Sequence, residues 1–471
     1  MTITWRTRTT EPEKPPMDLT CLFRPSSMAV IGVSTSRDSH PANVIYNKNH
    51  LRYPVQTFAV NPKGGRLNRE PLYRSVADIE IPVDLAVIAV KARFVPEVVS
   101  QCIDKGIKGA VIISGGFAES GSRDLQKQVT DIAASADFPF VGPNCLGIYS
   151  PDAVDTFFLP GERIIHPKKG NIGFVSQSGG VLVDQMVKFA GEGIGVSSAV
   201  SIGNKACLRE TDMIDWFEQD LATRVIAFYI EGFDCREGRD FIKRAETCSK
   251  PIVVLKAGKT ARGIAAASSH TASMAGDYRV FSQIMQQHCV AEADTEYELT
   301  SFCEALSCYP RGIFGNVGIV SVSGGHGVVA ADACGHHGLD IPKIAPSTAD
   351  AIRSRLSPEI REIAALENPL DLTGSCVDAD ILTSVRHLSR DQNLDCILAL
   401  LLPYSPGISA DIGAKLSQVA RNEGKPLIAY VPKEDKYKII TEGFELNKIP
   451  VASSVEGAVL MAKALKRCRP W

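Results

Sequence analysis

Short, fully apolar runs that alternate with helix-length stretches constrain the fold of this chain more than any other feature. In its first third the runs are MAVIGV, TFAVNP, LAVIAV, GAVIIS and FPFVGP, and turn-forming residues follow them. Strands that are apolar on both faces and alternate with helices indicate a parallel sheet covered on both sides. The alternation recurs in two later series, through TRVIAFYIEG and KPIVVLKAG and then through LDCILALLLP and KPLIAYVP.

These three series predict three consecutive α/β domains, and the first has the pattern of a doubly wound, nucleotide-binding type. A chain of 471 residues is long enough for about three domains. We expect a flexible arm over residues 1–16, followed by domains over 17–150, 151–308 and 309–471. Polar, proline-containing segments near the internal boundaries, PGERIIHPKKG and CYPRGIF, are typical of linkers.

Two segments repeat one pattern at the end of a strand. GNIGFVSQSGG (170–180) and GNVGIVSVSGG (315–325) share glycine, asparagine, valine and serine at the same offsets. Each ends in Ser-x-Ser-Gly-Gly and leads into a helical stretch. Similar domains packed as a pair would explain this repeat, and so would an old duplication.

The repeated turns define two candidate phosphate cradles. A turn of serine and glycine leaves the first N–H groups of the next helix free, and these groups and the helix dipole together attract an anion. Tight turns at strand ends are also a structural need of α/β domains, so both interpretations stay open. The residues concerned are Ser176, Ser178, Gly179 and Gly180 in the first turn, and Ser323, Gly324 and Gly325 in the second.

A single histidine, His270, lies in a strip of small residues, GIAAASSHTASMAGDY. A core histidine normally has periodic apolar neighbours, and this one does not. An imidazole nitrogen can act as a nucleophile near neutral pH if a partner fixes its tautomer and stabilises its charge. Glu231, at the end of VIAFYIEG, is the best-placed carboxylate. A histidine on a mobile loop also has structural explanations, so the residues alone leave this role open.

The strand ends of the first domain lack a dinucleotide fingerprint. AVIGVSTSRDS has only Gly32 where Gly-x-Gly-x-x-Gly would be needed, which disfavours a nicotinamide or flavin dehydrogenase. Lys63, in AVNPKGG, lies at the carboxyl edge of the predicted sheet and suits a phosphate, although a plain surface lysine is the alternative. Asn144 and Cys145, in VGPNCLGI, look buried and by themselves indicate little.

Composition disfavours several classes of partner. A formal net charge of −2 argues against nucleic acid or a membrane surface held by bulk electrostatics. The N-terminal segment lacks the apolar stretch of a signal peptide, and no run approaches the ~18 residues of a spanning helix. The 13 cysteines are scattered without a Cys-x-x-Cys pair, and the histidines have no metal spacing. We therefore expect reduced thiols, no metal site and a cytoplasmic location.

A series of short motifs, in order, resembles the α subunit of the NDP-forming (ADP-forming) acyl-CoA synthetases, a branch of the succinyl-CoA synthetase superfamily. The resemblance covers residues 17–465 and implies a Rossmann-like CoA-binding domain followed by two flavodoxin-like domains. The motifs are VIGVS, VNPKGG, GPNCLGI, FVSQSGG, VSIGNK, YIEGF, SSHTASMAG, VSVSGGHGVVAADA and ENPLDLTG.

The resemblance implies a reversible reaction, acyl-CoA + phosphate + ADP ⇌ carboxylate + CoA + ATP. Phosphate would attack the thioester to give an acyl phosphate, and His270 would take the phosphoryl group and pass it to ADP. Glu231 would orient the imidazole, and the two cradles would face the phosphohistidine. The residues expected at the CoA site are Gly32, Ser34, Lys63, Lys91, Asn144 and Cys145.

The sequence offers no candidate for the nucleotide site of the family. In the family an ATP-grasp module, either in the same polypeptide or in a separate β subunit, holds the nucleotide with Mg²⁺, and we expect no segment of domain length to remain here for it. The resemblance therefore implies a separate ATP-grasp β subunit, in an α₂β₂ assembly, that binds ADP or ATP with Mg²⁺. His326 stands where the pattern would have proline, which leaves the second cradle's geometry open. The alternative function is an inactive CoA-binding regulatory or scaffold protein of the same fold.

Overall fold

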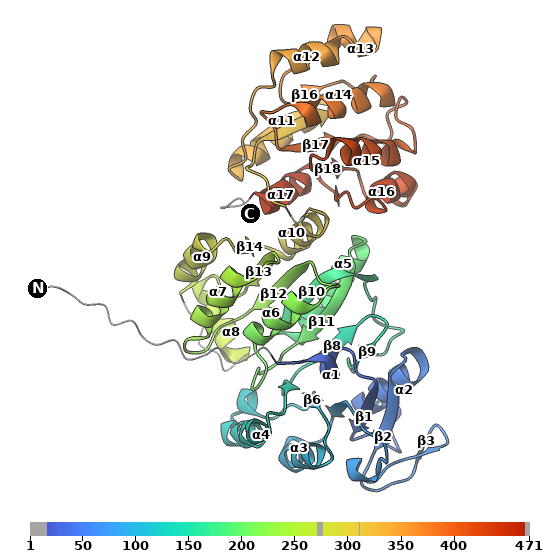
Figure 1. The fold of residues 1–471 in the computed structure, drawn as a ribbon, viewed down its shortest axis with the longest axis vertical. Helices are drawn as coiled ribbons and strands as arrows, with labels where there is room; N and C mark the ends of the chain where they lie inside the picture. The colour runs from blue at the N-terminus through green and yellow to red at the C-terminus, as the bar shows by residue number, and fades with distance from the viewer. Residues whose placement is uncertain (1–16, 271–276, 310, 467–471) are drawn as a thin grey trace, which may run out of the picture. The chain divides into compact units, whose positions relative to one another are not determined.

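The structure is a computed structural model that describes residues 17–270, 277–309 and 311–466, without the side chains of 267–270. The chain divides into two compact units. Figure 1 labels their helices and strands. Unit 1 comprises Met1–Phe158 and Ile202–Leu221, and unit 2 comprises Leu159–Ser201 and Ala222–Trp471. Both are built of parallel sheets with helices packed on them, so the predicted α/β fold class is confirmed.

Unit 1 is built on a parallel five-stranded sheet. Every residue of its three inner strands β1, β5 and β6 is buried, which is why these strands are continuous apolar runs in the sequence. The strand order is β2-β1-β5-β6-β7, so the winding reverses direction beside β1. The strands are β1 (Ser27–Ile31), β2 (Gln56–Val60), β5 (Leu85–Ile88), β6 (Gly109–Ile112) and β7 (Phe140–Val141).

Helices and two short hairpins complete unit 1. The segment from Ile202 belongs to it because α6 packs on α1: the Trp216 ring stacks on Phe23 with centroids 5.1 Å apart. The helices are α1 (Thr20–Phe23), α2 (Pro41–Arg52), α3 (Val95–Asp104), α4 (Arg123–Ser135) and α6 (Glu210–Gln219), with 3₁₀ turns at Val76–Asp78, Ala92–Phe94 and Ala118–Ser120. The hairpins are β3 (Arg66–Leu67) with β4 (Glu70–Pro71), and β8 (Gly147–Ser150) with β9 (Val154–Asp155).

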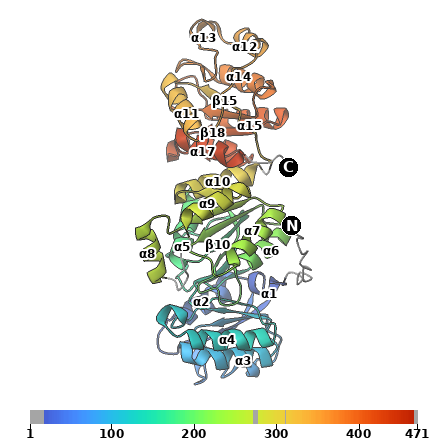
Figure 2. The same cartoon turned by 90° about the vertical axis from the view of Figure 1, so that its left-hand side faces the viewer.

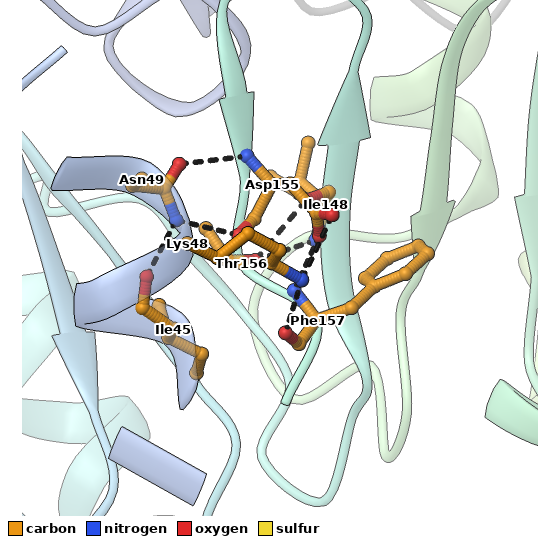
Figure 3. A network of polar contacts seen from close by, with 7 residues as sticks. All are labelled: Ile45, Lys48, Asn49, Ile148, Asp155, Thr156 and Phe157. Atoms are coloured by element: carbon orange, nitrogen blue, oxygen red, sulfur yellow. Dashed lines mark hydrogen bonds and ion pairs between the residues drawn. The ribbon is translucent and has the colours of Figure 1, made fainter. Parts of the chain in front are cut away.

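A buried polar network joins α2 to the β8–β9 hairpin (Figure 3). Lys48 Nζ lies 2.8 Å from Asp155 Oδ2 and donates to Phe157 O at 2.7 Å. Asn49 Nδ2 donates to Asp155 O at 2.7 Å, and its Oδ1 accepts from Asp155 N–H at 3.0 Å. Only 5% of the Lys48 side chain and 0% of the Asp155 side chain are exposed, so this is an ion pair in the interior.

The first sheet of unit 2 is parallel and carries the first cradle and the histidine strip. Its strands β10 to β14 have the order β14-β13-β12-β10-β11, so β10 lies between β12 and β11. The strands are β10 (Lys169–Ser176), β11 (Val196–Ser201), β12 (Val225–Ile230), β13 (Ile252–Lys256) and β14 (Ala291–Ala293). The helices are α5 (Gly179–Gly191), α7 (Glu237–Thr247), α8 (Ala261–His270), α9 (Tyr278–Gln287) and α10 (Glu296–Cys308).

The second sheet of unit 2 repeats this winding with the second cradle. The order β16-β15-β17-β18-β19 again puts the first strand between the second and the third. The strands are β15 (Val317–Ser321), β16 (Leu370–Asp371), β17 (Cys396–Leu400), β18 (Leu427–Tyr430) and β19 (Val451–Ala452). The helices are α11 (Gly324–His336), α12 (Pro346–Arg353), α13 (Pro358–Ile363), α14 (Asp378–Arg390), α15 (Ile412–Glu423), α16 (Lys438–Glu445) and α17 (Val455–Leu465), with a 3₁₀ turn at Asp435–Tyr437.

Helix α10 connects the two sheets of unit 2, because it packs on α17 as well as on its own sheet (Figure 2). A buried carboxyl on this helix, Glu304, accepts the N–H of Val451 at 2.8 Å. Lys433 Nζ lies 4.0 Å from Glu304 and 2.5 Å from Glu192 Oε2. Burial raises the pKa of Glu304 to about 7; Lys433 opposes this shift, and the charges of Glu192 and Glu445 add to it.

Glu304→Gln should therefore change the pH dependence of stability. Between its ordinary pKa of 4.5 and about 7, Glu304 holds a proton in the folded state that the unfolded chain releases, so wild-type stability falls as pH rises through this window. Glutamine keeps an oxygen for Val451 and does not titrate. The free energy of unfolding of the variant minus that of wild type should therefore be about 1–3 kcal/mol larger at pH 8 than at pH 5, as measured by urea unfolding. Glu442→Gln, at an exposed site on α16, is the control. Equal differences at both pH values would contradict the prediction.

Within the described ranges, no helix is both long and apolar enough to cross a membrane. No group of three or more His, Cys, Asp or Glu side chains in that part of the chain is arranged to hold a metal ion. Its cysteines are free thiols, and most of them are buried.

Candidate active site

The first cradle lies at the carboxyl end of β10. Ser176 ends the strand, and its hydroxyl donates to Ser178 O at 2.6 Å and accepts from Ser178 N–H at 3.1 Å. Ser178 is the N-cap of α5, with its Oγ 3.4 Å from the N–H of Val181. Gly179 and Gly180 follow, and a Cβ built on Gly180 would meet only Ser178 Oγ within 4 Å among the described atoms. Among the described residues, then, no other side chain covers Gly180 at the start of α5, which lies at the sheet edge where α/β folds bind ligands.

The second cradle repeats the two serine hydrogen bonds of the first, but its N-cap serine makes no side-chain cap hydrogen bond. Ser321 Oγ donates to Ser323 O at 2.6 Å and accepts from Ser323 N–H at 3.1 Å. Ser323 is the N-cap of α11, and α5 and α11 each have 13 residues. Ser321 was not among the predicted residues, although the repeat aligns it with Ser176. The repeat offset was the signal that could have identified it.

Two side chains lie near the start of α11 in the second cradle. Asp371 Oδ2 would lie 2.8 Å from a Cβ built on Gly324, so a carboxylate stands beside the start of α11. His326, whose effect on the geometry of the second cradle the sequence left open, stacks its ring on Tyr430 with centroids 5.7 Å apart. Within the part of the chain that the structure describes, a Cβ added to Gly325, as to Gly180, would meet only the N-cap serine within 4 Å. The sequence analysis missed Asp371, although it lies within ENPLDLTG.

Glu231 directly follows β12 and lies at the same sheet edge as the first cradle. The register pairs Ser176 with Tyr229, two residues before Glu231. Gln177, between the two cradle serines, accepts the Glu231 N–H at 2.7 Å. Burial and the Glu231 carboxylate raise the pKa of Tyr229. The structure therefore joins Glu231 to the first cradle, and Gln177, which the sequence analysis did not single out, makes the link.

His270 is the last residue of α8, and its side chain and residues 271–276 lie outside the described residues. The strip was expected to be a loop, but residues 261–270 form a helix. Thr260 begins it, with its Oγ1 accepting the N–H of Gly263 at 3.1 Å. Alanine has the highest helix propensity of all residues, and three consecutive alanines at 265–267 favour the helix over 261–270. That Glu231 orients the imidazole of His270 stays a prediction.

Four of the residues expected at the CoA site follow adjacent strands of unit 1. Gly32 and Ser34 follow β1, Lys63 follows β2, and Lys91 follows β5. A Cβ on Gly32 would lie 2.4 Å from Ala89 O, and its φ is +103°, so only glycine fits this approach. The lysines are exposed. Two ammonium groups at the edge where the winding reverses are suited to a phosphate-bearing ligand.

Asn144 and Cys145 were both expected to be buried, and of the two only Cys145 is. Cys145 is buried: its thiol donates to Ile112 O at 3.3 Å, and burial raises its pKa, so it packs in the core. Asn144 is exposed because its φ of 55° turns the chain outward at this position. Its Nδ2 donates to Asn204 Oδ1 at 3.3 Å, and Asn204 in turn donates to Glu119 at 2.5 Å. Asn204 and Glu119 were not singled out, although Asn204 lies in VSIGNK.

Comparison with known families defines the class of this protein. A CoA binding domain model matches residues 9–151, and a succinyl-CoA ligase like flavodoxin domain model matches residues 169–306. The acetyl-coenzyme A synthetase 1 of Ca. Korarchaeum cryptofilum, solved in complex with phosphate and ADP, superposes with a TM-score of 0.85 at 29% identity over 95% of this chain and 96% of that one. The fold is that of a CoA ligase of the succinyl-CoA ligase type.

Sequence relatives identify the family. The α subunit of acetate–CoA ligase [ADP-forming] II from Pyrococcus furiosus is 34% identical over 94% of this chain and 96% of its own length. Acetate–CoA ligase [ADP-forming] I from Archaeoglobus fulgidus is 38% identical over 81% of this chain, which spans 54% of that relative. The chain belongs to the family of ADP-forming acetate–CoA ligases, which are acid–thiol ligases, and it aligns with their α subunits. The resemblance seen in the motifs is confirmed.

Proposed function

We propose that this chain is the α subunit of an ADP-forming acyl-CoA ligase that converts acyl-CoA, phosphate and ADP reversibly into carboxylate, CoA and ATP. The observation that carries the proposal is the link through Gln177 between the main chain of Glu231 and the helix start at Ser178. A phosphohistidine needs a carboxylate to orient the imidazole and a helix N-terminus to hold the phosphoryl oxygens, and this link brings one residue of each kind to the same sheet edge.

In the proposed sequence, a phosphate oxygen attacks the thioester carbon, and CoA leaves as the thiolate. A ring nitrogen of His270 then attacks the phosphorus of the acyl phosphate, and the carboxylate leaves. ADP takes the phosphoryl group from the imidazole to form ATP. The starts of α5 and α11, at Ser178 and Ser323, stabilise the charge on the transferring oxygens, and Glu231 holds the imidazole in one tautomer.

The same proposal assigns the cofactor and partner sites. Gly32, Ser34, Lys63, Lys91 and Asn144 bind CoA, and the lysines pair with its phosphates, whereas Cys145 is left out because its thiol is buried. ADP or ATP, with Mg²⁺, binds to a separate ATP-grasp β subunit in a cytoplasmic α₂β₂ assembly. Supporting this, the P. furiosus relatives are named α subunits, and the chain spans about half of the A. fulgidus ligase.

Labelled phosphate tests the proposal directly. With an acyl-CoA from a panel of short, branched and aryl acids, the full-length chain should take up acid-labile label on His270 and release CoA. Adding ADP and the ATP-grasp partner should move the label to ATP. CoA binding without label would favour the inactive CoA-binding scaffold, and the absence of both would overturn the proposal.

A further inference from the structure

The main chain at Glu231 is held by side chains at the ends of the two strands that flank β12: Gln177, directly after β10, and Lys256, the last residue of β13. Backbone pairing of β12 reaches Tyr229 O, which accepts from Gln177 N–H at 3.2 Å, and Ile230 O, which accepts from Ala257 N–H at 2.9 Å. One residue further on, Glu231 N–H donates to Gln177 Oε1 at 2.7 Å. Glu231 O accepts from Lys256 Nζ at 2.6 Å. Two side chains thus extend the sheet pairing past its end, at the residue proposed to orient the imidazole.

Gln177 uses both ends of its carboxamide for this. Its Oε1 also accepts from Gly232 N–H at 3.1 Å, and its Nε2 donates to Gly232 O at 2.8 Å. Gln177 is 6% exposed. Hydrogen bonds are stronger in the interior than in water, so these bonds fix the position of the 231–232 main chain. On the other side, burial lowers the pKa of Lys256, while the Glu231 carboxylate opposes the shift.

The second cradle shows that the turn itself does not need Gln177. The repeat aligns Val322 with Gln177, and Val322 N–H donates to Leu400 O at 3.4 Å, as Gln177 N–H does to Tyr229 O. Counting on from Leu400, Leu402 occupies the place of Glu231. Val322 and Leu402 are buried and apolar. The serine–glycine turn is the same in both domains, while the pair Gln177–Glu231 is replaced as a unit by valine and leucine.

We propose that Gln177 is a positioning residue for catalysis: its carboxamide fixes the 231–232 main chain so that the Glu231 carboxylate meets the imidazole of His270. The inference rests on the function proposed above. A carboxylate that orients a nucleophile must be held in a narrow range of directions, and loss of such a supporting contact typically costs about 10- to 100-fold in activity. Gln177 acts through Glu231 and is not expected to touch substrate.

Gln177→Met tests this, because methionine has similar length and cannot form the hydrogen bonds to Glu231 and Gly232 described above. In the full-length chain, the rate constant of His270 labelling from acyl-CoA and phosphate should fall about 10- to 100-fold. The acyl-CoA concentration for half-maximal rate should stay within about twofold, since CoA binds elsewhere. Gln185→Met is the matched control: Gln185 is also a buried glutamine, on α5, and donates to Thr300 at 2.7 Å. Its labelling rate should stay within about twofold of wild type.

Gln177→Glu adds a readout that a purely structural role would not move. Protonated glutamic acid can accept from both N–H groups and donate to Gly232 O, as glutamine does, whereas the carboxylate loses the donor and repels Glu231. Its labelling rate relative to wild type should therefore rise as pH falls from 8 to 6. The inference is overturned if Gln177→Met labels at the wild-type rate, or if the Gln177→Glu ratio does not vary with pH. No label on wild type would remove the proposed function as well, so the two failures are distinguishable.

Discussion

His270→Asn should abolish phosphoryl transfer to the chain and lower overall ligase activity by more than about 10³-fold. Asparagine is similar in size and polar, but its amide nitrogen is not a nucleophile at neutral pH, so no phosphoryl intermediate can form. The measurement is incorporation of labelled phosphate in the presence of acyl-CoA, together with ATP formation once the ATP-grasp partner and ADP are added. CoA binding should persist, because its proposed site is in unit 1.

His288→Asn is the control for this substitution. His288 is the C-cap residue of α9, and its Nδ1 lies 2.6 Å from Glu246 Oε1. Its loss should leave the label unchanged. Glu231→Gln should give an intermediate result, with label formed about 10- to 100-fold more slowly, because a neutral amide orients the ring but does not stabilise its charge. Label that persists in His270→Asn would contradict the nucleophile assignment.

The sequence predicted the sheets because parallel strands buried on both faces have to be apolar throughout. Every residue of β15 and β17 is buried, as in β1, and the apolar runs GIVSV and CILAL predict these two strands. The repeat likewise predicted two equivalent turns, since serine and glycine at a strand end have few other uses. These features depend only on residues that are close together in the sequence, so they could be predicted from it.

The contacts that join distant segments could not be predicted in this way. Gln177 is the variable residue in Ser-x-Ser, and its importance appears only once β10 and β12 are neighbours. Asn204 meets Glu119 across 85 positions in the sequence. The segment from Ile202 joins unit 1 through Trp216, which no periodicity indicates. Tertiary context also decided the exposure of Asn144. Its backbone, in the loop after β7, has the left-handed conformation, and its side chain is exposed.

The interior ion pair of unit 1 was also invisible in the sequence, and it should have the largest effect on stability. Lys48 and Asp155 are 107 positions apart, and nothing near either residue indicates a partner. In the fold, Lys48 Nζ and Asp155 Oδ2 lie 2.8 Å apart with almost no exposed side chain (Figure 3). The main-chain carbonyl of Phe157 accepts from the same ammonium group. Removing the ammonium would leave a carboxylate in the interior without its counter-charge.

Lys48→Met should therefore lower the free energy of unfolding by about 3–5 kcal/mol, the usual cost of breaking a buried pair on one side. Lys127→Met is the matched control, because Lys127 pairs with Asp131 at 2.5 Å with 72% and 62% of the two side chains exposed, and an exposed pair contributes less than about 1 kcal/mol. Adding Asp155→Asn to Lys48→Met should recover part of the loss, since the neutral amide retains an oxygen for the N–H of Phe157, which Asp155 Oδ1 accepts at 3.0 Å. Urea unfolding measures all three. If Lys48→Met costs no more than Lys127→Met, burial of the pair contributes nothing to stability, and the partial recovery in the double variant should then vanish as well.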